Sequence, residues 1–224
     1  VEIDSIAYGF ISKYLNAIKQ GMQTNDWKAA DKSLAEIDAY QKEWGKNVLP
    51  SETKVNMEIL YNKFNVFLWL MIAYSMIGGI LVFLTFIEVL GSETKARKFV
   101  HYLTNTFIGL LVLIFTIHLL GLAMRWYLSG HAPWSNGYEA IIFISWVGVL
   151  AGLLLYKNRN AFIPATGAIV ATIMMGFAHG GGLLDPQITP LVPVLKSYWL
   201  MVHVGIITSS YGFFGLSAVI SVIS

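Results

Sequence analysis

The chain has 224 residues, 56% of them hydrophobic, and its mean hydropathy of +0.61 exceeds what a water-soluble domain needs, so water cannot be its only solvent. Its formal net charge of +2 includes no basic cluster beside an exposed aromatic platform, which argues against a nucleic-acid partner. The lack of cysteine excludes a disulfide framework and a thiolate metal site.

Residues 1–63 are polar, and their pattern predicts an extramembrane helical hairpin. Nine of the 13 Asp and Glu residues and eight of the 15 Lys and Arg residues lie in this segment. Apolar residues recur at helical spacing from Ile6 to Ile18, which indicates a first helix. Asn25 or Asp26 is placed to cap a second helix.

A third helix is expected to begin at Ser51 and to continue to Leu90 without a break. We interpret the N-terminal hairpin as a packing module or spacer, with a docking surface for a secreted partner as the alternative. The chain begins at Val1 without the pattern of a signal peptide, so we expect it to be part of a longer protein.

Five apolar windows are long enough to cross a bilayer, and they predict an all-α, polytopic membrane helix bundle of about five transmembrane helices. The windows are residues 64–89, 103–124, 140–156, 161–178 and 198–224. Glycines in the first and last windows are expected to let helices approach closely. They are Gly78, Gly79, Gly205, Gly212 and Gly215.

The loops between the windows predict an orientation. Segments 91–100 and 157–160 hold five Lys and Arg residues, whereas the loops on the other side hold only Arg125 and Lys196. Because short cytoplasmic loops carry the excess of basic residues, the first two segments are placed in the cytoplasm. Residues 1–63 and the loops around His131 and Asp185 then face outward.

The histidines are unevenly placed once this orientation is accepted. Only His101 belongs to the inner side, and four imidazoles at one membrane face suggest a site that holds a metal or handles protons. The four are His118, His131, His179 and His203. The competing interpretation, which we favour for His131 and His179, is a histidine satisfied by a backbone carbonyl.

The segment "GHAPWSNGYEAIIFISW" at residues 130–146 enters the third window through a turn. Asn136 and Glu139 have the spacing of a capping box, so Glu139 is interpreted as a cap rather than a general acid. Trp134 and Tyr138 fit two interpretations equally well: residues of the interfacial aromatic belt, or the lining of a ligand groove.

The start of the last window places a cation, a flat aromatic ring and an imidazole on one strip. Lys196, Trp199 and His203 share a helix face, and His203 lies about 7 Å inside the span. Such a strip suits a flat, apolar ligand that bears carboxylates and accepts nitrogen at its centre. Haem fits this description better than a bare divalent ion, which usually needs three or four converging ligands.

Two segments together, "GHAPWSNGYEAIIFISW" and "PLVPVLKSYWLMVHV" at residues 190–204, resemble the system II cytochrome c biogenesis proteins, the CcsA or fused CcsBA family. The resemblance covers about residues 104–224. It implies a bacterial cytoplasmic-membrane protein that moves haem b to the outer face and attaches it to apocytochrome c. Residues 64–224 would then be a truncated haem-handling region.

The resemblance also implies roles for single residues. His203 corresponds to one of two external axial ligands of the haem iron, while His131, His179 and His118 are weaker candidates. Trp199, Trp134 and Tyr138 would line the haem groove, and Lys196 would meet a propionate. The family's second ligand and its "WGxxWxWD" segment follow later in its chains, so we expect this segment alone not to complete a haem lyase.

Three functions compete at this point. The leading hypothesis is a membrane part of a cytochrome c synthase, which presents haem to a CxxCH segment and works with the rest of a CcsBA chain or a separate CcsB partner. The second is a haem exporter or chaperone that forms no thioether bond. The third is a non-haem transporter or structural subunit, against which the position of the histidines near one face argues.

Overall fold

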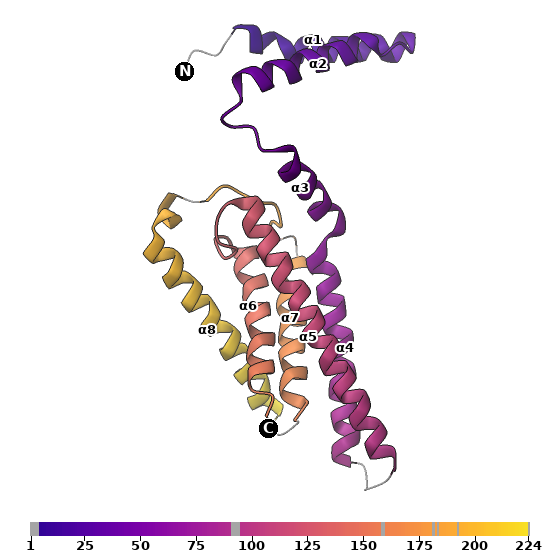
Figure 1. The fold of residues 1–224 in the computed structure, drawn as a ribbon, viewed down its shortest axis with the longest axis vertical. Coiled ribbons are helices and arrows are strands. Elements are labelled where there is room, and N and C mark those ends of the chain that lie inside the picture. The colour runs from indigo at the N-terminus through magenta and orange to yellow at the C-terminus, as the bar shows by residue number, and fades with distance from the viewer. Residues whose placement is uncertain are drawn as a thin grey trace. The chain divides into compact units, whose positions relative to one another are not determined.

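The computed structural model describes residues 5–90, 95–157, 160–180, 182, 184–191 and 193–223. The chain divides into two compact units, residues 1–56 and 57–224. The described elements are helical, and Figure 1 shows them in chain order. They are α1 (Ser5–Thr24), α2 (Lys28–Trp44), α3 (Glu52–Phe64), α4 (Val66–Leu90), α5 (Lys95–Ser129), α6 (Gly137–Leu154), α7 (Phe162–Gly180), the 3₁₀ turn η1 (Pro193–Lys196) and α8 (Tyr198–Ile223).

The first unit contains the predicted hairpin of α1 and α2. The Phe10 and Tyr40 rings meet edge to face at 5.1 Å, and Lys13 forms an ion pair with Glu36. The predicted caps are wrong for α2: its N-cap is Trp27, which makes no side-chain capping hydrogen bond. Asp26, one residue earlier, still accepts a hydrogen bond from the Lys28 amide at 3.1 Å. Asn25 instead adopts a left-handed conformation with φ of 55°.

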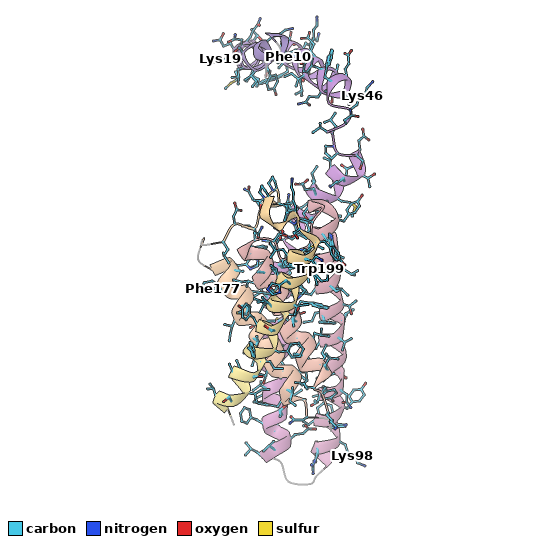
Figure 2. The ribbon with its side chains drawn as sticks, turned by 90° about the vertical axis from the view of Figure 1, so that its left-hand side faces the viewer. Phe10, Lys19, Lys46, Lys98, Phe177 and Trp199 are labelled. Atoms are coloured by element: carbon cyan, nitrogen blue, oxygen red, sulfur yellow. The ribbon has the colours of Figure 1, made fainter. Side chains whose placement is uncertain are left out.

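The second unit is the predicted helix bundle. Five helical spans within the described residues are long and apolar enough to cross a membrane, and they match the five predicted windows. In the bundle, α7 packs between α4 and α6, α5 packs on α4, and α8 packs mainly on α6 (Figure 1). Figure 2 shows Lys98 of α5 at one end of this bundle and Trp199 of α8 towards the other.

The expectation of one continuous helix to Leu90 is wrong. The helix ends at Phe64, Asn65 takes a left-handed conformation with φ of 43°, and α4 begins at Val66. Asparagine tolerates this region of φ better than most residues do, because its short polar side chain can form local hydrogen bonds. The beginning of α3 is as predicted, because the Ser51 hydroxyl oxygen accepts a hydrogen bond from the Lys54 amide at 3.3 Å.

Close helix packing at glycine is confirmed for four of the five predicted positions. A Cβ atom would lie 3.1 Å from the Ala168 side chain at Gly78, 3.2 Å from the Trp134 ring at Gly205, 2.8 Å from Val147 at Gly212 and 3.3 Å from Val170 at Gly215. Gly79 is the exception, since nothing lies within 4 Å of its Cβ position, so the prediction is wrong there.

A close backbone-to-backbone contact lies between α6 and α7, where no glycine was predicted to matter. A Cβ atom on Gly167 would lie 2.8 Å from the Gly148 carbonyl oxygen and 3.4 Å from the Gly152 Cα atom. Both neighbours are backbone, so neither can turn aside as a side chain would. These three small residues therefore set the distance between α6 and α7.

This contact gives a test of the fold. In Gly167→Ala the added methyl group must push α6 and α7 apart, which is expected to cost about 1–3 kcal/mol, the range typical of overpacking. Thermal unfolding of the purified protein in detergent, followed by circular dichroism, should show a clearly lowered midpoint. Gly79→Ala is the matched control and should unfold at the parent temperature or above it, because its methyl group meets nothing and alanine favours a helix. Equal midpoints for the two variants would contradict the packing described.

Candidate functional site

Arg125, near the end of α5, is the centre of a buried polar cluster. Its side chain is 1% exposed, and its Nε donates to Glu139 Oε1 of α6 at 2.9 Å. Nη1 donates to the Tyr61 hydroxyl of α3 at 3.2 Å, and the guanidinium carbon lies 5.2 Å from the centre of the Tyr138 ring. A buried charge is tolerated only when it is paired and its donors are used, and this arrangement meets both conditions.

The same guanidinium holds a loop onto the bundle. We name residues 184–191 the strap, which leads from α7 towards η1 and α8. Arg125 Nη1 donates to the Pro186 carbonyl at 2.8 Å, and Nη2 donates to the Gln187 carbonyl at 3.0 Å. Leu184 and Ile188 of the strap pack against the hydrophobic core. The strap is thus fixed by both charge-assisted hydrogen bonds and apolar contacts.

Glu139 works as a helix cap as well as a counter-ion. Its amide donates to Asn136 Oδ1 at 2.8 Å, and its Oε2 accepts from the Ser135 amide at 2.9 Å. This confirms the predicted cap, although the carboxylate reaches back to Ser135 rather than to Asn136 itself. Since both carboxylate oxygens are engaged and the side chain is buried, Glu139 has no position from which to act as a general acid on a ligand.

His131 also contacts the strap. The ring is 8% exposed, with Nδ1 3.2 Å from the Ala132 carbonyl oxygen and Nε2 3.1 Å from the Thr189 carbonyl oxygen. A carbonyl oxygen only accepts hydrogen bonds, and a neutral imidazole carries one N–H, so one of the two ring nitrogens donates to its carbonyl while the other only lies against one. A His131 ring that lies against backbone carbonyls is what the interpretation favoured from the sequence predicts.

His179 and His118 are likewise engaged inside the bundle. His179 Nδ1 donates to the Met175 carbonyl at 2.8 Å, which leaves Nε2, 3.4 Å from the Tyr138 hydroxyl, to accept from it. His118 is fully buried, about 16 Å from the end of α5, deeper than the outer end at which the sequence placed it. Its Nδ1 lies 3.2 Å from the Tyr74 hydroxyl, while Nε2 has no hydrogen-bond partner among the described residues.

Trp134 and Tyr138 are packing residues in this arrangement. The Trp134 Nε1 donates to the Met201 carbonyl of α8 at 3.1 Å, and its ring fills the space beside Gly205. Tyr138 is 3% exposed, between Arg125 and His179. Trp134 therefore attaches α8 to the loop before α6, and Tyr138 supports the buried cluster.

His203, Trp199 and Lys196 differ from the other candidates because they lie at the surface. All three are exposed, Trp199 at 79%, and Figure 2 shows Trp199 on the outer side of α8. Within the described part of the chain, the His203 ring makes no hydrogen bond or ion pair. The structure thus separates His203, which makes no hydrogen bond within the described residues, from three histidines that contact hydrogen-bonding groups of the protein. These are His118, buried in the bundle, His131, buried in the loop before α6, and His179, half-buried at the end of α7.

The four histidines do not form a common site. Among the described residues, no three His, Cys, Asp or Glu side chains lie together in a group that could hold a metal ion. A bare-ion centre of the kind that four imidazoles at one face suggested is therefore not assembled in the described residues. One exposed imidazole beside a large aromatic ring remains as the candidate ligand.

Sequence reasoning missed the Arg125 cluster, although a signal for it was present. Arg125 is the one charged residue in the second apolar window's C-terminal flank, and Glu139 is the one at the start of the third. Opposite charges at neighbouring ends of two membrane helices joined by a short loop are natural partners, because neither is stable alone in hydrocarbon. Tyr61 and Tyr74 gave no comparable signal.

Comparison with known proteins finds one family model, described as cytochrome C assembly protein, that matches residues 134–224. Protein NrfI of Wolinella succinogenes is 40% identical over 186 residues, which are 83% of this chain and 20% of that protein. Cytochrome c biogenesis protein CcsA of Lobularia maritima is 36% identical over 149 residues, 63% of this chain and 42% of the relative. The corresponding protein of Cyanophora paradoxa is 38% identical over 130 residues. The aligned part is thus a fifth to two fifths of each relative's length.

The buried ion pair gives a stability prediction. Arg125→Gln leaves the Glu139 carboxylate buried without its counter-charge and frees the strap, and it is expected to lower the free energy of unfolding by about 3–5 kcal/mol. Glu139→Gln should be costly for the same reason. The double variant should lose clearly less than the sum of the two single losses, because it leaves no uncompensated charge. Denaturant unfolding in detergent measures all three, and strictly additive losses would contradict the pairing.

Proposed function

This chain belongs to the cytochrome c assembly protein family, and on that premise we propose that its membrane bundle binds haem through His203 at the outer membrane face. Haem is presented there for thioether attachment to the CxxCH segment of an apocytochrome c. The carrying observation is that His203 is exposed and makes no hydrogen bond within the described residues, whereas the other three candidate histidines contact hydrogen-bonding groups of the protein.

Two residues near His203 have side chains that match parts of a haem group. Trp199 lies one helical turn before His203 with 79% of its surface exposed, so its flat ring can pack against a porphyrin face. Lys196 is exposed at the end of η1, where its ammonium group can meet a propionate. Bound haem supplies the iron and the vinyl groups, while the chain fixes their position towards incoming thiols.

Trp134 and Tyr138 act on this site from inside the bundle. Trp134 bonds to the Met201 carbonyl, two residues before His203, and so fixes the start of α8 on which the imidazole stands. Tyr138 stacks under Arg125, which holds the strap that leads to α8. Their contribution is to the placing of His203 and Trp199 rather than to direct haem contact.

The orientation follows from charge. The protein is a multi-pass membrane protein, and Lys98 lies at the bundle end remote from Trp199 (Figure 2). Because basic residues mark the cytoplasmic side, the end with the strap and the start of α8 faces the periplasm of a bacterial cytoplasmic membrane. Residues 1–63 are then extracytoplasmic, residues 64–224 handle haem, and the remaining parts of the site come from the rest of a CcsBA-type chain or a CcsB-type partner.

The experiment is the haem spectrum of variants purified from membranes in the complete assembly. His203→Ala should remove or shift the Soret band, because one axial ligand is lost, and should abolish thioether formation on a CxxCH peptide. His101→Ala, a histidine at the opposite end of the bundle, is the matched control and should keep the parent spectrum. A parent Soret band in His203→Ala would refute the ligand assignment, and bound haem without thioether formation in the parent protein would favour the exporter.

A further inference from the structure

A polar hollow of about 190 Å³ opens where the helix breaks between α3 and α4. It is closed on the other sides by the start of α6 and by the strap. Its lining residues are Tyr61, Asn62, Asn65, Val66, Phe67, Tyr138, Pro186 and Gln187. Of these residues, only Tyr138 also supports the haem site proposed above, from inside the bundle.

The polar part of the lining offers donors and acceptors that no hydrogen bond within the described residues uses. The side-chain amides of Asn62, Asn65 and Gln187 are exposed and make no hydrogen bond within the described residues. The Tyr61 hydroxyl accepts from Arg125, so its own proton remains free to donate. Asn65 holds the left-handed backbone conformation at the helix break, a strained arrangement of the kind that recurs at binding sites.

The charge of the lining restricts the ligand. No lining side chain is charged, and the nearby Arg125 is neutralised by Glu139, with its donors used on Tyr61 and on the strap carbonyls. An ion in the hollow would therefore lack a counter-charge, which disfavours it. A neutral ligand with both donors and acceptors matches the lining, because each carboxamide can donate and accept at once.

The rest of the lining is apolar and adjoins the amides. Val66, Phe67, Tyr138 and Pro186 present methyl, aromatic and ring carbon surface. A ligand that carries amide groups beside an apolar side chain is a short segment of polypeptide. Backbone N–H and C=O groups would pair with the carboxamides and the phenol, and one side chain would rest on the aromatic surface.

From this chemistry we propose that the hollow binds a short extended segment of a polypeptide substrate through its backbone. Its identification as part of the apocytochrome rests on the proposed function, and the site lies at the bundle end that this function assigns to the outer face. Because the contacts are made to the peptide backbone, the hollow can bind substrate segments of many sequences. It holds the substrate near the haem with little specificity for its side chains.

The test measures binding of a fluorescently labelled CxxCH peptide, with serine at both cysteine positions, to the purified protein in nanodiscs without added haem. Asn65→Gly keeps the left-handed backbone and removes the amide, and Gln187→Ala removes the amide contributed by the strap. Each is expected to weaken binding about threefold to tenfold, the effect of one lost hydrogen bond. Asn16→Ala, an exposed amide of α1, is the control and should bind like the parent protein.

A second probe is the same peptide with its central backbone nitrogens methylated, which should bind about tenfold more weakly or not at all. Parent-like affinity in Asn65→Gly and Gln187→Ala, or equal affinity for the methylated peptide, would overturn the proposal. Because the peptide assay contains no added haem, absence of a haem band in the parent protein together with normal peptide binding would count against the haem site alone.

Discussion

A polar side chain surrounded by hydrocarbon must find its hydrogen-bond partner inside the protein, and this constraint organises the bundle. Thr104, Ser145 and Thr166 meet it locally, each donating to the carbonyl four residues earlier on its own helix. Arg125 cannot meet it locally, because a guanidinium carries a charge and five donors. Its partners come from α3, α6 and the strap, so one buried side chain connects segments that lie far apart in the sequence.

The same constraint sorts the histidines. His131 and His179 lie against backbone carbonyls, and His118 lies beside the Tyr74 hydroxyl, which gives each ring a place in the internal hydrogen bonding. His203 stands on the exposed face of an apolar helix without such a partner. Its ring nitrogens are therefore not used by any hydrogen bond within the described residues. The strap and Trp134 fix the helix that carries it, so the buried cluster and the exposed ring belong to one arrangement.

A structural feature can be predicted from the sequence when it depends on residues close together in the chain, and not when it depends on contacts with distant residues. Bilayer thickness fixes the length of a span, and the Asn136 cap depends on residues three apart, so both follow from the sequence. The break at Asn65 does not, because a single asparagine also occurs inside continuous helices, so the sequence alone does not indicate its left-handed backbone. Glycine behaves similarly: Gly212 meets Val147, while Gly79, with the same local signature, faces open space. Whether a histidine is engaged also depends on a residue distant in the chain, as Thr189 is for His131.

The central claim, that one imidazole is available and three are engaged, is tested most directly by the chemical reactivity of the histidines. The haem-free protein in detergent is treated briefly with diethyl pyrocarbonate, and modification of each histidine is followed by mass spectrometry over time. The account predicts that His203 reacts well before His118, His131 and His179. Protection of His203 together with rapid modification of His131 or His179 would contradict it.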